Sequence, residues 1–378
     1  MVTTDGQRGI DVPTRIQDTT AEFMTAALRS TATISDDAEV AEVDVDQIGE
    51  GVGLMCTLAR VTLRYRGPAR GAPSSVILKV PSELPENRHV GDLFNFYERE
   101  GRFYEHIGQS IDVRVPHCLF NHIDVDAQRF AVVLEDFGAR TMVSQIIGMD
   151  PERAGEAVTA IARAHAQWWD TPAVRALEWM PRAIDPHMIG AGEQYRQAWP
   201  RFVELFADVL PDGAIELGRR VGPAWETTMT ELYQRAPMTL CHGDFRADNL
   251  MFDDAATGKE HVGVVDWQIA YRSAGISDIG YLITQSMTAD DRRAHDRGLI
   301  SAWYDSLCSA LGEAPPGYSL DDAWDGYRAC TGVMTVYAVV AGGQLDAGNE
   351  RGMQLVSDMA DRSFSAALDL DAGSLIPT

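Results

Sequence analysis

The segment that most constrains the fold of this chain is a non-helical stretch, residues 238–268, inside a half of the chain with mostly helical periodicity. It contains His-Gly-Asp-Phe-Arg-Ala-Asp-Asn at positions 242–249 and ends with an apolar run that leads to Asp266. The turn-rich residues between them predict a β-hairpin that places Asn249 and Asp266 near each other. The stretch therefore predicts a loop and hairpin that gather three polar side chains, and the third is Asp244.

These three side chains have the composition that phosphoryl transfer requires. One carboxylate, Asp244, accepts or orients the proton of an acceptor hydroxyl. An amide oxygen and a second carboxylate hold Mg²⁺ against the phosphates, so we expect Asn249 and Asp266 to be the metal ligands. A lone Asp would more often cap a turn, and it is the spacing of the set that favours catalysis.

The segment resembles the H-G-D-x-x-x-x-N pattern of aminoglycoside phosphotransferases, choline kinases and ecdysteroid-kinase-like proteins. Val-Val-Asp-Trp-Gln at 264–268 is similar to their metal-binding strand end, and Asp-Trp-Gln leans toward the ecdysteroid-kinase-like branch. The resemblance covers about residues 40–345 and implies a protein-kinase-like fold. This fold is α+β and bilobal: a small antiparallel sheet with one helix, residues 1–137, and a larger, mainly helical lobe, residues 138–378.

The upstream lobe agrees with this resemblance. The chain has only two lysines; Lys259 lies in a polar turn, whereas Lys79 ends an apolar strand. In the family, a lysine at this place contacts the phosphates of ATP, and a buried ammonium needs a counter-charge. We expect Glu100 to supply it, because Glu100 begins a sequence similar to the family's Glu-x-x-Phe-Tyr helix. Glu98 is the alternative.

The remaining nucleotide contacts follow from the resemblance alone. The strand and linker Val-Val-Leu-Glu-Asp-Phe-Gly would hold the adenine through backbone groups near Glu135, Asp136 and Phe137. Gly51 and Gly53, with a third glycine just upstream, would let a backbone loop approach the phosphates. Their spacing departs from G-x-G-x-x-G, so the loop differs from the common nucleotide-binding pattern.

Periodicity and turn signals give the expected elements. Strands are predicted at 39–48, 54–66, 74–80, 117–125 and 129–136. Helices are predicted at 19–30, 91–108, from Asp150-Pro151 onward, 190–209, 213–235, 277–311 (open to a break into two), 322–342 and 349–369.

Charge and cysteine content exclude several classes of partner. The net charge is −24, and acidic residues exceed basic ones on both sides of residue 137. Neither lobe offers a basic face, so nucleic acid and anionic membranes are not expected partners. Five cysteines without C-x-x-C spacing, no signal-peptide pattern and no apolar stretch long enough to span a bilayer favour a cytoplasmic protein. Oligomeric state stays open.

Other polar residues have structural interpretations. His242 is expected to hold the loop by hydrogen bonds, and His165 to be a core histidine. Asp278 resembles a downstream Asp of the family and is expected to brace the loop or cap a helix. Arg246 and Asp248 could reach the acceptor or the phosphates, or be solvated loop charges. The eight tryptophans all lie beyond residue 150 and are expected mainly to fill the core.

The resemblance implies an ATP- and Mg²⁺-dependent kinase that acts on a hydroxyl of a small molecule. Steroid-like compounds, amino alcohols and other hydroxylated metabolites are the expected acceptors, ahead of aminoglycosides. A protein kinase is disfavoured because Gly243 replaces the Arg of H-R-D and residues 267–277 leave no room for an activation segment. A nucleotide-binding pseudokinase is disfavoured because every catalytic position carries a competent residue.

Overall fold

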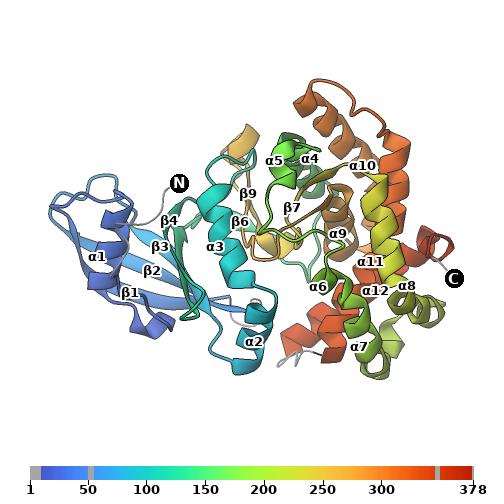
Figure 1. Ribbon diagram of the computed structural model, residues 1–378, viewed down its shortest axis with the longest axis horizontal. Helices are drawn as coiled ribbons and strands as arrows, with labels where there is room; N and C mark the ends of the chain where they lie inside the picture. The colour runs from blue at the N-terminus through green and yellow to red at the C-terminus, as the bar shows by residue number, and fades with distance from the viewer. Residues whose placement is uncertain (1–9, 50–54, 345–349, 377–378) are drawn as a thin grey trace. The chain divides into compact units, whose positions relative to one another are not determined.

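A five-stranded antiparallel sheet forms the core of the first of two compact units (Figure 1). The computed structural model describes residues 10–49, 55–344 and 350–376. The first unit comprises the chain up to Ala139 except residues 112–114, which belong with the second unit from Arg140 onward. The elements of the first unit are η2 (Ile16–Asp18), α1 (Ala21–Ser30), β1 (Glu39–Ile48), β2 (Cys56–Arg66), β3 (Ser75–Pro81), α2 (Pro85–Leu93), α3 (Phe96–His106), β4 (Cys118–Asp124) and β5 (Arg129–Glu135).

The strand order is β1-β2-β3-β5-β4, which makes β3 central, as its apolar sequence predicted. Alternate residues of a strand point to opposite faces of the sheet. Leu78 belongs to the buried cluster that α1 covers, where Phe23 meets the ring of Phe120 edge-on at 5.6 Å. The next residue, Lys79, therefore faces the other side, where it pairs with α3.

The prediction of one continuous helix at 91–108 was wrong, because this part of the chain forms two helices, α2 and α3. Asn95 adopts a left-handed backbone conformation with φ of 54°, which ends the first helix and begins the second. The apolar periodicity runs through this break, and Asn is one of the residue types that tolerates the conformation. The first unit therefore carries α1, α2 and α3 rather than one packed helix.

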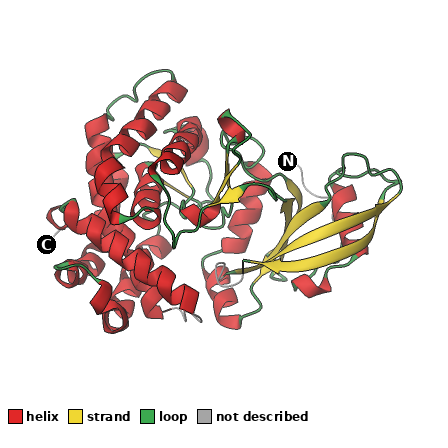
Figure 2. Ribbon diagram, turned by 180° about the vertical axis from the view of Figure 1, so that it is seen from behind, coloured by secondary structure: helices red, strands yellow, loops and turns green. Residues whose placement is uncertain are grey.

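Helices dominate the second unit, and its short strands lie among them (Figure 2). Its helices are α4 (Pro151–Trp168), α5 (Pro172–Arg175), α6 (Pro186–Ile189), α7 (Ala191–Phe206), η3 (Ala207–Val209), α8 (Ala214–Arg235), η4 (Ala247–Asn249), η5 (Gly258–Glu260), α9 (Ile276–Ser286), α10 (Ala289–Leu311), α11 (Leu320–Gln344), α12 (Glu350–Asp369) and η6 (Ala372–Ser374). Its strands are β6 (Thr141–Met142), β7 (Met238–Cys241), β8 (Leu250–Phe252), β9 (Val262–Val264) and β10 (Tyr271–Ala274).

Two features of the second unit position the polar loop. Asp150 caps α4 by accepting a hydrogen bond from the amide of Arg153, with Pro151 at the first helical position, as predicted. The helix predicted at 277–311 is broken at Met287 into α9 and α10. Every residue of α9 is buried, so this helix forms a rigid support beneath the elements around it.

Among the residues that the structure describes, no helix combines the length and the apolar composition needed to cross a membrane.

Candidate active site

The loop between β7 and β8 holds the predicted polar residues, and its backbone requires glycine at its second position. Gly243 has φ of 87°, a conformation that L side chains rarely adopt. A Cβ atom here would also lie 2.5 Å from the carbonyl oxygen of Ile269. The hydroxyl of Tyr337 donates a hydrogen bond of 3.1 Å to the Gly243 carbonyl. Gly243 therefore lets the loop pass close to the chain that follows β9.

Asp278 on α9 braces this loop, as the sequence predicted. Its carboxylate accepts hydrogen bonds from the backbone amides of His242 at 2.7 Å and Gly243 at 2.9 Å. His165 adds a third contact, 3.2 Å from its Nε2 to the same carboxylate. The indole of Trp303 donates to Nδ1 of His165 at 3.0 Å, so Nε2 is the nitrogen that carries the proton. His165 is thus a fully buried core histidine with both ring nitrogens bonded.

His165, Cys241 and Asp278 place three potential ligand atoms within 4.8 Å of one another. Each of these groups already has a protein partner, and the Cys241 thiol donates to the carbonyl of Ala274 at 3.4 Å. The cluster is therefore a structural hydrogen-bond network.

His242 ties the loop to the end of β9, which confirms its structural role. Its Nδ1 accepts a hydrogen bond of 3.2 Å from the amide of Asp244, so Nε2 is the protonated nitrogen and donates to the carbonyl of Val265 at 2.9 Å. The imidazole also packs against the buried indole of Trp267, with ring centroids 4.6 Å apart. One histidine side chain thereby fixes the residues that precede Asp266.

Asp244 is held on both carboxylate oxygens. Its Oδ1 lies 3.0 Å from Nε of Arg246, and its Oδ2 accepts a hydrogen bond of 2.9 Å from Nδ2 of Asn249. Burial by itself raises the pKa of the Asp244 carboxyl, but the Arg246 charge and hydrogen bonds from Arg246 and Tyr281 bring that pKa below its usual value. Asp244 is therefore ionised at neutral pH, the state that a proton acceptor needs.

Arg246 and Asp248 are buried partners and not solvated loop charges. Asp248 has 4% of its side chain exposed, and its Oδ2 lies 3.2 Å from Nη1 of Arg246. The same Nη1 donates to the side-chain Oε1 of Gln145 at 2.6 Å, and the backbone amide of Gln145 donates to Oδ1 of Asp248 at 2.9 Å. The alternative that Arg246 and Asp248 are solvated charges was therefore wrong. The sequence could not show this, because their partner Gln145 comes from a distant segment before α4.

The hairpin β8–β9 brings the two predicted metal ligands to its open end. Leu250 pairs with Val264, and the amide of Val265 donates to the carbonyl of Asn249 at 3.0 Å. Asp266 follows directly, with φ of 64°, a left-handed conformation that Asp tolerates better than most residues. The Nδ2 of Asn249 donates to Asp244 twice, to its backbone carbonyl at 2.8 Å and to its carboxylate at 2.9 Å. The amide oxygen is therefore the atom through which Asn249 would bind a metal ion.

In the first unit, Lys79 pairs with Glu100. The Nζ–Oε2 distance is 2.7 Å, and only 5% and 3% of the two side chains are exposed. Glu98 instead binds Arg102 one turn later on α3, also at 2.7 Å. The structure thus selects Glu100 over Glu98 as the partner of Lys79, and the contact of Lys79 with a nucleotide stays a prediction.

Glu135 and Phe137 lie at the end of β5 and just beyond it. The Glu135 amide donates to the carbonyl of His117 at 2.8 Å, and its carboxylate accepts from the His117 amide at 3.0 Å. Between them, Asp136 binds Arg60 at 2.7 Å and the hydroxyl of Ser75 at 2.8 Å. These bonds fix the backbone of the predicted adenine linker.

The predicted phosphate loop is only partly placed. Gly51 and Gly53 lie outside the described residues. Gly49 is described and has φ of 70°, and a Cβ atom there would meet no heavy atom of the described residues within 4 Å.

The sequence interpretation missed three residues around Asp244. Gln145 carries no motif and gave no signal. The rings of Tyr281 and Tyr337 pack at the loop in a tilted arrangement, with ring centroids 4.3 Å apart and an interplanar angle of 49°. Tyr281 lies three residues after Asp278 on α9, so helical spacing could have placed both on the face toward the loop.

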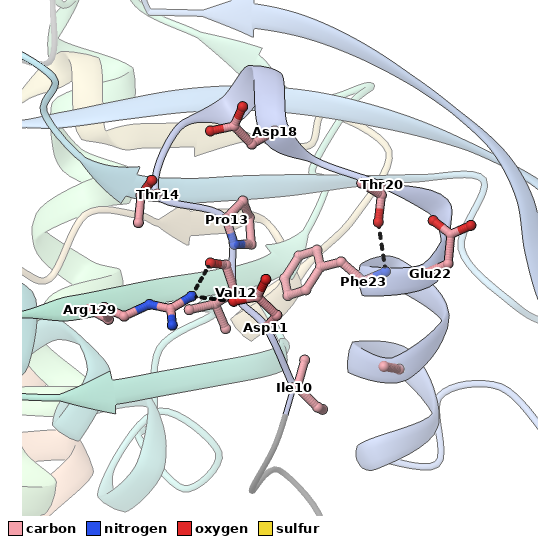
Figure 3. Close-up of a pocket in the computed structure, with 11 residues that line it drawn as sticks. Ile10, Asp11, Val12, Pro13, Thr14, Asp18, Thr20, Glu22, Phe23 and Arg129 are labelled. Atoms are coloured by element: carbon pink, nitrogen blue, oxygen red, sulfur yellow. Dashed lines mark hydrogen bonds and ion pairs between the residues drawn. The ribbon is translucent and has the colours of Figure 1, made fainter. Parts of the chain in front are cut away.

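A pocket of about 590 Å³ lies in the first unit, on the segment before α1 (Figure 3). Arg129 crosses it and donates hydrogen bonds of 2.7 Å to the carboxylate of Asp11 and the carbonyl of Val12. Phe23 and the capping residue Thr20 complete the wall on the side of α1. None of the predicted site residues lines this pocket.

Residues 70–320 match the sequence model of the phosphotransferase enzyme family, and because they make up more than half of the chain, the chain belongs to this family. Choline kinase from Cryptosporidium parvum Iowa II has a similar structure, with a TM-score of 0.58 at 9% identity over 94% of this chain and 96% of that chain. The GDP complex of a mutant aminoglycoside 2'-phosphotransferase-IIIa has a TM-score of 0.51 at 14% identity over 94% and 98%. No curated protein sequence matches significantly. The fold is the protein-kinase-like fold that the sequence predicted.

Proposed function

We propose that the protein transfers the γ-phosphoryl group of ATP to a hydroxyl of a small molecule, with Mg²⁺ as cofactor. The observation that carries the proposal is the geometry of one loop and one hairpin. The Asp244 carboxylate is ionised and held by Asn249, and Asn249 lies beside the strand end that leads to Asp266. Membership of the phosphotransferase enzyme family supports this reaction class.

The donor set of the hairpin fits magnesium. Mg²⁺ prefers carboxylate and carbonyl oxygens, and Asn249 and Asp266 offer one of each. Because the Asn249 nitrogen donates to Asp244, its side-chain oxygen is the atom that would bind the ion. The bound ion would neutralise charge on the phosphates.

The other residues take roles that follow from their chemistry. Asp244 accepts the proton of the acceptor hydroxyl while the oxygen of that hydroxyl bonds to the γ-phosphorus. The bond between the γ-phosphorus and the β–γ bridging oxygen breaks, and ADP leaves. Lys79, held by Glu100, positions the α- and β-phosphates. Backbone groups at Glu135 and Phe137 hold the adenine. Catalysis then rests on positioning and charge neutralisation.

The acceptor we propose is a hydroxylated metabolite, such as a steroid-like compound or an amino alcohol. We also propose a cytoplasmic location, because the five cysteines of the sequence have no C-x-x-C spacing. The structurally similar aminoglycoside 2'-phosphotransferase-IIIa was solved with GDP, so both ATP and GTP belong in the test.

The test is a phosphate-transfer screen. Purified protein, nucleotide and Mg²⁺ are incubated with sterols, choline-like amines, other hydroxylated metabolites and aminoglycosides, and nucleoside diphosphate release is measured. We expect a hit that Asp244→Asn abolishes while nucleotide binding persists. Nucleotide binding without transfer to any acceptor would favour the pseudokinase alternative, and full activity of Asp244→Asn would refute the assignment of the base.

A further inference from the structure

Arg246 sits between two carboxylates inside the loop. Its Nε is 3.0 Å from Oδ1 of Asp244, and its Nη1 is 3.2 Å from Oδ2 of Asp248 and donates to Gln145 Oε1 at 2.6 Å. The exposed fractions of the Arg246, Asp244 and Asp248 side chains are 13%, 17% and 4%. One guanidinium therefore joins the proposed base to a second, more deeply buried acid.

Two roles are open to a cation at this position: it binds the transferred phosphate, or it orients Asp244. The contacts favour orientation. The guanidinium and its two carboxylates together carry a net negative charge, which does not attract a phosphate. Nε and Nη1, two of its three nitrogens, already donate to protein oxygens.

Gln145 and Asp248, the partners that hold Arg246 opposite Asp244, are themselves fixed by hydrogen bonds. Gln145 is fully buried, and its amide donates to Oδ1 of Asp248 at 2.9 Å. Its side-chain nitrogen donates to the carbonyl of Gln285 on α9 at 3.1 Å, and Arg362 of α12 donates to the Gln145 carbonyl at 2.6 Å. Arg246 is thus anchored through Gln145 to α9 and α12, and it can hold the Asp244 carboxylate in one orientation.

We propose that Arg246 is a positioning residue that fixes the orientation of the Asp244 carboxylate through its anchor on Asp248 and Gln145, and that it does not bind the nucleotide phosphates. This inference rests on the proposed function. The two roles of Arg246 differ in their kinetic consequences. Loss of a residue that orients the base lowers the turnover number, whereas loss of a residue that binds a phosphate lowers the affinity for the nucleotide.

The experiment compares the unmodified protein with Arg246→Lys and Asp248→Asn. Lys keeps the charge but cannot bridge two carboxylates with a planar fork. We expect Arg246→Lys to lower kcat about 100-fold, as misplacement of a catalytic group by about 1 Å can do. We expect KM for both substrates, and the Kd of the Mg²⁺ complex of a non-hydrolysable ATP analogue measured by calorimetry, to stay within about threefold, far below the effect on kcat. Asp248→Asn is nearly isosteric and weakens only the anchor, so kcat should fall about tenfold, with the same unchanged affinities.

The matched control is Arg293→Lys. Arg293 also joins two carboxylates, those of Asp290 at 2.9 Å and Asp369 at 2.8 Å, but it lies on α10 away from the loop. Its substitution should leave kcat unchanged.

A loss of affinity for the Mg²⁺ complex of the non-hydrolysable ATP analogue, with unchanged kcat in Arg246→Lys, would overturn the inference and assign Arg246 to the phosphates. Should Arg246→Lys fail to fold, Asp248→Asn decides, and unchanged kcat in that variant would equally overturn it. Absence of transfer by the unmodified protein would refute the proposed function itself, which distinguishes the two failures.

Discussion

The backbone amide of His242 donates a hydrogen bond of 2.7 Å to the carboxylate of Asp278, which lies 36 residues further along the chain. The next amide, that of Gly243, donates to the other oxygen of the same carboxylate. The position of the loop that carries Asp244 thus depends on a residue of the buried helix α9 as well as on the loop's own His242 and Gly243. Loop and helix are coupled, and the coupling can be measured.

We expect Asp278→Ala to reduce the free energy of unfolding by about 3 kcal/mol or more, because two backbone amides and the His165 N–H lose a charged acceptor. Urea denaturation measures this loss, and phosphate transfer should fall with it. Asp322→Ala is the matched control: Asp322 also accepts a backbone hydrogen bond, from Ser319 at 2.8 Å, but at an exposed helix start. Its loss should cost about 1 kcal/mol. Equal losses in the two variants would contradict the bracing role.

Glu100→Gln tests the buried ion pair with Lys79. The substitution removes the counter-charge that Glu100 supplies to the buried Lys79 ammonium, and the loss of one partner of a buried ion pair typically costs about 3–5 kcal/mol of stability. Glu98→Gln is the control on the same helix, because Glu98 pairs with Arg102 in a partly exposed position. That pair should contribute no more than about 0.5 kcal/mol. If thermal or urea unfolding ranked the two variants the other way, the assignment of the buried partner would be wrong.

Gly243→Ala separates backbone strain from steric contact. Gly312 has nearly the same φ, 82°, but in the described part of the chain no heavy atom lies within 4 Å of where its Cβ would be. Gly312→Ala should therefore cost only the strain of the left-handed conformation, about 1–2 kcal/mol. Gly243→Ala adds the contact with the Ile269 carbonyl and should cost at least about 1 kcal/mol more, measured by denaturant unfolding. Similar costs would show that the loop can move away from Ile269.

His261 should make stability depend on pH near neutrality. It lies in the β8–β9 connection, with Nε2 2.9 Å from Glu156 of α4 and Nδ1 2.7 Å from the carbonyl of Asp253. Burial lowers the pKa of His261, but the bonds to Asp253 and Glu156 outweigh it and raise that pKa above 6.5. The stabilisation is therefore complete below pH 6.5 and is lost as pH rises through the folded-state pKa.

The measurement is the free energy of unfolding of the unmodified protein and of His261→Gln between about pH 5.5 and 8.5, a window that spans the ordinary histidine pKa. The difference between the two should shrink as pH rises. A difference that stays constant across this range would show that folding does not shift the pKa of the His261 imidazole.

The sequence predicted the parts of the site that are local in the chain. The loop at 242–249 and the hairpin to Asp266 follow from turn residues and strand periodicity, and the central place of Lys79's strand follows from its apolar run. The family motif then added the expected roles.

What the sequence did not predict depends on long-range contacts. Arg246 and Asp248 look like solvated charges until Gln145, about a hundred residues away, closes their network. Gln145 is in turn fixed by Arg362, near the end of the chain. The break between α2 and α3 depends on the backbone of a single residue, Asn95, which interrupts no apolar pattern. Neither feature leaves a periodic signal.

The two lysines differ in exposure in a way that is useful at the bench. Lys79 is 5% exposed and engaged by Glu100, whereas Lys259 is 42% exposed in the connection between β8 and β9. Amine-reactive dyes should therefore modify Lys259 and spare Lys79. The α-amino group reacts with such dyes as well, and a low pH of labelling would favour it over Lys259. The label would sit at the turn of the hairpin whose opposite end carries Asn249 and Asp266, where its fluorescence could report ligand binding without the introduction of a cysteine.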